Sequence, residues 1–98
     1  MAKFESKDGN LYIDGKKALK GWESFSGWYW FGTEIERKQD SIMHDGQVAK
    51  NDSIWFGFVQ GLCEEWGAWS EAELNELIEK GRVWEIPRAN LPYSGKRN

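Results

Sequence analysis

Few residues in this chain of 98 residues could carry out catalysis. The single histidine, His44, stands beside Asp45 in a polar stretch, and the single cysteine is Cys63. One histidine and one cysteine do not supply the tetrahedral ligand set of a typical zinc site, and they do not indicate a Cys–His nucleophile. No glycine-rich phosphate loop opens a helix. We therefore expect no catalytic residue, no metal and no cofactor, and we predict that the protein is not an enzyme.

Two pairs of glutamates are the remaining candidates for acid–base chemistry. Glu64 and Glu65 are adjacent, so they point to opposite faces of an extended chain and cannot act as one acid–base pair. Glu34 and Glu36 lie two positions apart and share a face of a strand. A small hydrolase or transferase that uses Glu34, Glu36 or His44 stays open as a third interpretation. It requires a shaped cleft that holds a carboxylate with a raised pKa.

Tryptophan is unusually frequent, with seven residues in the chain. Trp28, Trp30 and Trp55 lie in strand-like segments that also contain Gly32, Gly57 and Gly61. An indole ring over a strand glycine fills the space of the missing side chain, and glycine also permits close approach of another backbone. One helix cannot bury every indole in a chain of this length, so we expect some rings to be partly exposed. Such rings would form an apolar patch for a protein partner or for a second copy.

The net charge of −3 is unevenly distributed. Residues 88–98 carry +3, which leaves −6 on residues 1–87. Within that body, residues 64–79 contain six glutamates and no basic residue. An acidic body lacks the basic surface that nucleic acid requires. Two interpretations of the acidic stretch stay open: a face that complements a basic partner, or a solvated helix face.

A ligand-binding module is the alternative to protein binding. Exposed tryptophans would then stack on an oligosaccharide or on single-stranded nucleic acid. Lys16, Lys17 and Lys20 form the only basic cluster outside the C-terminal segment, with Trp22 and Trp28 near them in the sequence. The small size of this cluster and the acidic body disfavour nucleic acid as a partner.

Turn signals and periodicity predict the elements that position these residues. Asp-Gly pairs, which favour two-residue hairpin turns, occur at Asp8, Asp14 and Asp45. Alternation along the aromatic segment predicts one continuous apolar face from Tyr29 to Ile35. The predicted strands are a hairpin of 11–13 and 16–19, a central strand at 27–36, a partner strand at 53–63 and a short strand at 82–86. Between them we expect a loop or irregular edge at 21–27 and a polar excursion at 37–52, which contains a small hairpin near 42–48.

A helix is predicted at about 71–80. Ser70 and Glu73 form a capping box, and Gly81 provides the expected stop. Leu74, Leu77 and Ile78 give the apolar stripe, and Glu76 can pair with Lys80 one turn later; these positions follow the helical period.

The order of strands and one late helix predicts an α+β fold. We expect a small twisted antiparallel sheet of about 4–6 strands, with the helix packed on one face and the other face uncovered. Residues 1–87 would form one domain, and residues 88–98 would be a basic, flexible, loosely held tail. A lone cysteine allows no intramolecular disulfide, and no apolar run is long enough to span a membrane or to act as a secretory signal. A cytoplasmic location is the expectation.

Three motifs are similar to successive blocks of a known family. They are "SGWYWFGTE" at 26–34, "WFGFVQGLCEEWGAWSEAELNEL" at 55–77 and "WEIPRANL" at 84–91. Together they resemble domain of unknown function 2958, a family of small proteins carried by phages, plasmids and other mobile elements. The chain departs from that pattern in its N-terminus, in the excursion and after the last strand. The family has no established activity, so the resemblance transfers no catalytic residue and implies only an intracellular accessory protein of a mobile element.

The primary functional expectation is therefore a non-enzymatic accessory protein of phage or plasmid type. It would bind a host or self-encoded protein through an aromatic patch and an acidic face. One form of this expectation is inhibition of a nucleic-acid-processing or defence complex, with acidic groups in a nucleic-acid channel. A homodimer stays open, and neither nucleic acid nor a membrane is expected as a partner. The expected interaction residues are Trp28, Trp30, Trp55, Glu64, Glu65, Glu73 and Glu76.

Overall fold

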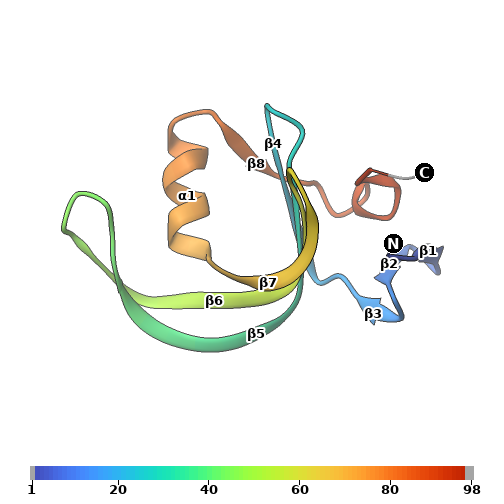
Figure 1. The fold of residues 1–98 in the computed structure, drawn as a ribbon, viewed down its shortest axis with the longest axis horizontal. Coiled ribbons are helices and arrows are strands. Elements are labelled where there is room, and N and C mark those ends of the chain that lie inside the picture. The colour runs from blue at the N-terminus through green and yellow to red at the C-terminus, as the bar shows by residue number, and fades with distance from the viewer. Residues whose placement is uncertain (1, 97–98) are drawn as a thin grey trace.

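The computed structural model describes residues 2–96 and shows an α+β fold of two antiparallel sheets and one helix (Figure 1). This architecture confirms the predicted fold class. The small sheet has the order β1 (Phe4–Lys7), β2 (Asn10–Ile13), β3 (Lys16–Lys17). The large sheet has the order β7 (Glu64–Ser70), β6 (Val48–Gln60), β5 (Tyr29–Ile42), β4 (Lys20–Ser24), β8 (Val83–Glu85). The helix is α1 (Glu71–Glu79), and a short 3-10 helix, η1 (Leu91–Tyr93), follows β8.

Asp-Gly turns shape the small sheet. Asp8 and Gly9 have φ angles of 54° and 76°, and Asp14 and Gly15 have φ angles of 50° and 80°. Positive φ at both central residues defines the hairpin turn that matches the twist of the flanking strands. The predicted hairpin around Asp14 is therefore confirmed, although β3 is shorter than the predicted second strand.

The predicted excursion at 37–52 is a continuation of the central strands. β5 has 14 residues and β6 has 13, whereas β4 and β7 have five and seven. The outer part of the β5–β6 ribbon, residues 37–52, has no third strand beside it, and we call it the arm. The predicted small hairpin forms its tip, where Ile42 pairs with Val48. Figure 1 shows the ribbon curving beneath α1 and continuing past it.

A bulge at Thr33 changes which side chains share a face. Gly32 pairs with Gly57, and the next pair on the ladder is Glu34 with Phe56, so Thr33 is the extra residue. Such an insertion shifts the alternation by one position and bends the strand. The predicted continuous face from Tyr29 to Ile35 is therefore wrong beyond Gly32.

Both faces of the large sheet are covered, which corrects the expectation of one open face. α1 covers one face, where Leu74 of the helix packs with Trp22, Trp55 and Val83. The opposite face packs against the small sheet and the C-terminal segment, with buried side chains at Leu11, Ile13, Phe31, Phe58 and Leu91. Either a helix or a second sheet can cover one face of a sheet, and this chain uses one of each.

The predicted loop at 21–27 is wrong over its first half, because β4 is an inner strand between β5 and β8. Trp22 is fully buried there, and its ring meets the rings of Trp55 and Trp69 edge-on at centroid distances of 5.6 and 6.0 Å. Burial of large aromatic rings outweighs the weak strand signal of the sequence around Gly21.

The predicted helix is confirmed within one residue. Ser70 Oγ accepts from the N–H of Glu73 over 3.2 Å, as an N-cap should. The chain leaves the helix at Gly81, whose φ of 72° is the left-handed conformation expected there. No helix among residues 2–96 is long and apolar enough to cross a membrane.

The C-terminal segment is held as far as residue 96, so the expectation of a loose tail is wrong for the described part. Leu91 and Pro92 are buried. The fully buried Gln60 amide donates to the carbonyl of Lys96 over 2.9 Å and accepts from its N–H over 2.7 Å. The basic residue Arg97 and the terminal Asn98 lie outside the described residues.

Candidate protein-binding groove

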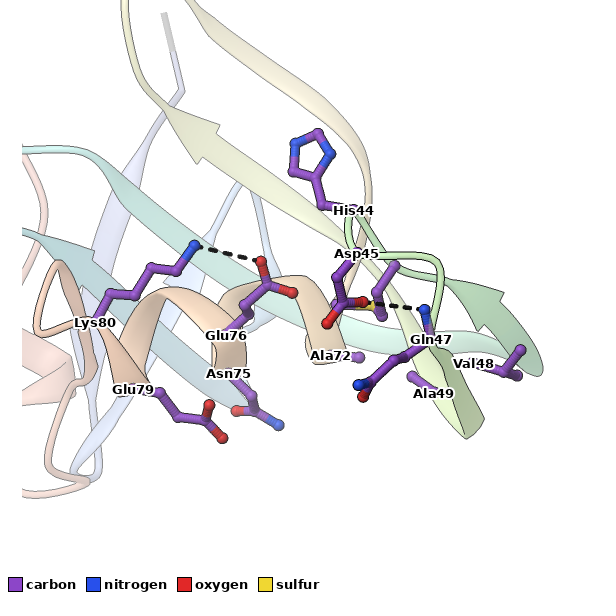
Figure 2. A pocket seen from close by; sticks show the side chains of 11 residues that line it. His44, Asp45, Gln47, Val48, Ala49, Ala72, Asn75, Glu76, Glu79 and Lys80 are labelled. Atoms are coloured by element: carbon purple, nitrogen blue, oxygen red, sulfur yellow. Dashed lines mark hydrogen bonds and ion pairs between the residues drawn. The ribbon is translucent and has the colours of Figure 1, made fainter.

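A groove separates the arm from the exposed side of α1, and its main hollow has a volume of about 730 Å³. Ala72, Asn75 and Glu76 of α1 line one side, and Asp45 and Ala49 of the arm line the other (Figure 2). An adjoining hollow of about 420 Å³ lies against Ile42 and Leu77. Met43, His44 and Glu76 line both hollows, so the two form one open groove.

The arm contributes exposed apolar surface. Ile42 is 79% exposed and Val48 is 53% exposed, and the two residues are paired across the ribbon. Met43 and Ala49, the chain neighbours of Ile42 and Val48, point to the other face of the arm and line the groove there. A two-stranded ribbon gains little stability from apolar side chains that stay in water, so these residues do not serve the fold. Exposed apolar side chains gathered at one place are typical of an interaction surface.

α1 contributes negative charge to the same groove. The lining contains the carboxylates of Asp45, Glu73, Glu76 and Glu79 and the single ammonium group of Lys80, a net charge of −3. Lys80 Nζ pairs with Glu76 Oε1 at 3.6 Å, as predicted (Figure 2). No cation within residues 2–96 forms an ion pair with Glu79, and a carboxylate in the last helical turn opposes the helix dipole. The carboxylate of Glu79 therefore lowers the stability of α1, and it stands at a position that lines the groove.

Asp52 ties the arm to α1. Its carboxylate accepts from Ser41 Oγ of β5 over 2.7 Å, from the N–H of Ala72 over 2.9 Å, and from the N-cap hydroxyl of Ser70. Burial alone would raise the pKa of Asp52, but the hydrogen bonds from Ser70, Ser41 and the backbone N–H groups of Ala72 and Ser53 outweigh it and lower the pKa below its ordinary value. The arm is thus anchored at its root, and the groove is formed before any partner arrives.

The structure separates the predicted interaction residues into three groups. Glu73 and Glu76 line the groove. Glu64 and Glu65 are exposed at the start of β7 and do not line it. The tryptophans belong to neither place.

Trp55 is only 5% exposed, which corrects its expected place in a surface patch. Its ring packs over Gly32, where a Cβ atom would overlap it. Trp28 covers Gly61 in the same way, so the predicted packing of indole over glycine is confirmed at Gly32 and Gly61. At Gly57 the prediction is wrong, because the backbone of Phe31 lies where a Cβ atom would be. Trp55 is buried because a ring that fills the space above a glycine is itself covered by that contact.

Trp28 and Trp30 are partly exposed, with ring centroids 5.9 Å apart. Trp30 also packs against the cluster beneath α1. Among the seven tryptophans, only Trp84 is exposed, and 43% of its surface is solvent-accessible. The rings therefore do not form the open stacking platform that a sugar or single-stranded nucleic acid requires.

The candidate acid–base residues are not assembled. Glu34 is exposed, and the exposed Glu36 pairs with Arg37 at 3.2 Å. His44 is exposed at the tip of the arm, and no group of three or more potential metal ligands occurs within residues 2–96. The pKa of Tyr29 is raised by burial and by its hydrogen bond to Glu23, which keeps the phenol protonated as a donor. Glu34 and Glu36 do not line the two hollows that His44 lines.

The comparisons with known proteins add no assignment. No family model, no curated protein and no solved structure matches the chain. The resemblance to domain of unknown function 2958 therefore stays an expectation, and the functional argument depends on the groove.

Half of this groove was not predicted from the amino-acid sequence. Ile42, Val48 and Asp45 lie in the segment that looked like a polar excursion, and Glu79 was counted only as part of the acidic stretch. One available signal was the pair of apolar residues on each side of the Asp45-Gly46 turn. These residues predicted the hairpin, but their exposure follows from the absence of a neighbouring strand.

Proposed function

We propose that the protein is a non-enzymatic interaction protein that binds a basic segment of another protein in the groove between the arm and α1. The observation that carries the proposal is the opposition of Met43 and Ala49 to the carboxylates of Glu73, Glu76 and Glu79 across one open groove. The exposed side chains of Ile42 and Val48 lie beside it, on the other face of the arm. A partner segment with one apolar side and one basic side would complement both walls of the groove.

The two walls support binding in different ways. Burial of the apolar arm removes hydrocarbon from water and supplies affinity, at roughly 25 cal/mol per Å² before the costs of association. The carboxylates attract a basic partner, orient it and exclude acidic proteins. A partner with a basic and apolar segment is therefore the class that this surface selects.

The biological setting of the proposal comes from the resemblance rather than from the groove. We include in the proposal a cytoplasmic accessory protein of a phage or plasmid, with a host or self-encoded protein as its partner. Inhibition of a nucleic-acid-processing or defence complex agrees with the acidic body, because such complexes hold basic channels. The single free cysteine, which is exposed, is consistent with a reducing compartment.

A pair of charge-reversal variants tests the proposal. The first is Glu76→Lys/Glu79→Lys in the groove, and the matched control is Glu64→Lys/Glu65→Lys on β7, with the same change in net charge. The groove variant should stay folded, since it loses one surface ion pair worth about 0.3–0.5 kcal/mol and gains a favourable charge at the helix end.

The measurement is a tagged pull-down from lysate of the source organism with nuclease present, read by mass spectrometry. We expect the wild-type protein and the β7 control to recover the same basic protein in stoichiometric amount. The groove variant should bind that purified protein roughly tenfold more weakly. Equal binding by both variants would contradict the proposal and would return attention to Trp28, Trp30 and the start of β7.

A further inference from the structure

We infer that the outer edge of β7 binds an extended segment of another protein, which adds a sixth strand to the large sheet. The segment places a bulky apolar side chain over Gly67 and a basic side chain beside Glu65. Neither residue lines the groove, so this surface is a second one. The inference goes beyond the proposed function and does not rest on it.

The outer edge of β7 is regular and free. β7 is the last strand of the large sheet, beside β6 (Figure 1). The two strands pair without a register shift from Ile54–Ser70 to Gln60–Glu64, so every second residue of β7 points its N–H and C=O groups away from β6. Within residues 2–96, no group outside β6 forms a hydrogen bond with the backbone of residues 64–68. Such an edge is a template for one more strand.

The other strand edges of the chain are short or irregular. β1, β3 and β8 have only two to four residues. The long strands β5 and β6 have register shifts at three places in their pairing. Short strands and bulges are the devices by which proteins protect an edge from other chains. β7 has seven residues, no bulge, no proline and no lysine, so it is the edge that the chain leaves available.

Gly67, in the middle of β7, is a strand glycine that no other part of the chain covers. Gly32 and Gly61 each lie beneath an indole ring, whereas a Cβ atom at Gly67 would meet no atom within 4 Å. Gly67 has no positive φ, so neither packing nor backbone conformation requires glycine there. A strand glycine permits close approach of another chain, and a bulky side chain from a neighbouring strand fills the space above it. We therefore expect the bound segment to place such a side chain over Gly67.

Glu65 determines the charge of the segment. It lies two positions from Gly67, so the two residues share one face of β7. Glu65 is exposed, and no cation within residues 2–96 forms an ion pair with it. A basic residue two positions from the bulky residue of the added strand would lie opposite Glu65 and attract it. The edge therefore selects an extended segment in which an apolar and a basic residue alternate with a residue between them.

A second copy of this chain fits the edge poorly. If two β7 strands paired antiparallel about their centres, Gly67 would face Gly67 of the other copy, and both would stay uncovered. Glu64 would then lie opposite Ser70 of the other copy, beside the like charge of Glu71. The occupant is therefore a segment of a different protein.

The first test uses a labelled peptide, Thr-Lys-Thr-Trp-Thr-Lys-Thr, with both termini blocked. Its order is the same in both directions, so the Trp can lie over Gly67 and one Lys beside Glu65 in either strand orientation. Binding to the protein is measured by fluorescence anisotropy at about 0.15 M salt. We expect a dissociation constant below about 1 mM, and replacement of the central Trp by Gly should weaken binding about tenfold. Absence of saturable binding, or equal binding of the two peptides, would overturn the inference.

Two N-methylated forms of the peptide test the strand pairing itself. Methyl groups on every second backbone nitrogen remove the N–H donors on one side of a strand, and the two forms differ in the side that they block. We expect one form to bind at least about tenfold more weakly than the parent peptide and the other to bind within about threefold of it. Equal binding of both forms would show that side chains alone hold the peptide, and the added strand would be wrong.

Variants of β7 show where the peptide binds. Gly67→Val fills the open space with a side chain suited to a strand, so it should remove the preference for the Trp peptide over the Gly peptide. Glu65→Lys should weaken binding at least about fivefold, whereas Glu64→Lys, the same change on the opposite face of β7, should weaken it less than about twofold. Circular dichroism checks that each variant is folded. An unchanged preference for Trp in Gly67→Val would place the peptide elsewhere and overturn the inference.

The groove variant separates this edge from the proposed function. Glu76→Lys/Glu79→Lys should leave peptide binding within about twofold, because salt screens distant charges. If this variant abolishes peptide binding while Gly67→Val has no effect, the peptide lies in the groove; the inference is then wrong and the proposed function is retained. If sedimentation equilibrium shows a dimer that Gly67→Val abolishes, a second copy occupies the edge and the inference is again wrong.

Discussion

The indole N–H of Trp55 donates to Glu71 Oε1 over 2.7 Å and so joins the middle of the large sheet to the first turn of α1. Glu71 Oε1 also lies 3.7 Å from the ammonium group of Lys20 on β4. Trp55 therefore positions the helix whose outer side forms one wall of the groove. Its role is to support the binding surface from beneath, where a partner does not reach it.

Replacement of Gly32 by alanine should destabilise the fold because its Cβ would overlap the ring of Trp55. We expect Gly32→Ala to lower the free energy of unfolding by about 1–3 kcal/mol, the usual cost of overpacking. Gly67→Ala is the matched control, since nothing lies within 4 Å of the added Cβ. Urea unfolding followed by tryptophan fluorescence measures both. Equal midpoints for the two variants would show that Trp55 moves aside without cost.

Asp52→Asn should loosen the junction of the arm and α1. Loss of charge-assisted hydrogen bonds to Ser70, Ser41 and the Ala72 N–H should cost about 1–3 kcal/mol. Asp45→Asn makes the same chemical change at an exposed position and should cost less than about 0.5 kcal/mol.

The same carboxylate predicts a dependence of stability on pH. The pKa of Asp52 is lower in the folded protein than in the unfolded chain, so the folded state binds fewer protons. This contribution is present above the unfolded value of about 3.9 and is lost as the pH falls through the folded pKa. Urea unfolding between about pH 6 and pH 3 should therefore show a steeper loss of stability for the wild-type protein than for Asp52→Asn. Parallel curves would contradict this assignment.

Gln60→Ala should release the end of the chain. The Gln60 amide makes both hydrogen bonds to the backbone of Lys96, and it is fully buried. We expect faster amide hydrogen exchange at Lys96 and a loss of about 1–3 kcal/mol in the free energy of unfolding. Gln39→Ala, at an exposed glutamine of the arm, is the control and should leave exchange at Lys96 unchanged. Unaltered protection of Lys96 in Gln60→Ala would mean that Leu91 and Pro92 hold the segment without the clamp.

The apolar arm should contribute to binding and not to stability. Ile42→Thr/Val48→Thr keeps the β-branched side chains at exposed positions and should change the free energy of unfolding by less than about 0.5 kcal/mol. Ile54→Thr makes the same substitution on the same ribbon at a buried position and should cost about 1–3 kcal/mol. A large loss of stability in the arm variant would show that its apolar side chains serve the fold.

The amino-acid sequence by itself determined the features whose partners lie within a few residues. The Asp14-Gly15 turn, the N-cap at Ser70 and the stop at Gly81 each depend on local backbone preference, and each was predicted at its observed place. The helical stripe and the pairing of Glu76 with Lys80 follow from the period of the helix for the same reason.

Only the tertiary structure decided which faces are covered and where the groove lies. Burial of Trp22 and Trp55 depends on the layers above them, and the clamp of Gln60 on Lys96 joins residues 36 positions apart. The bulge at Thr33 arises from the register between two strands, and the alternation within one segment does not reveal it. The bend of the ribbon and the anchoring of Asp52 at Ser70 then bring the arm to α1. Met43 and Ala49 face the acidic helix because distant segments pack together, and no local rule places them there.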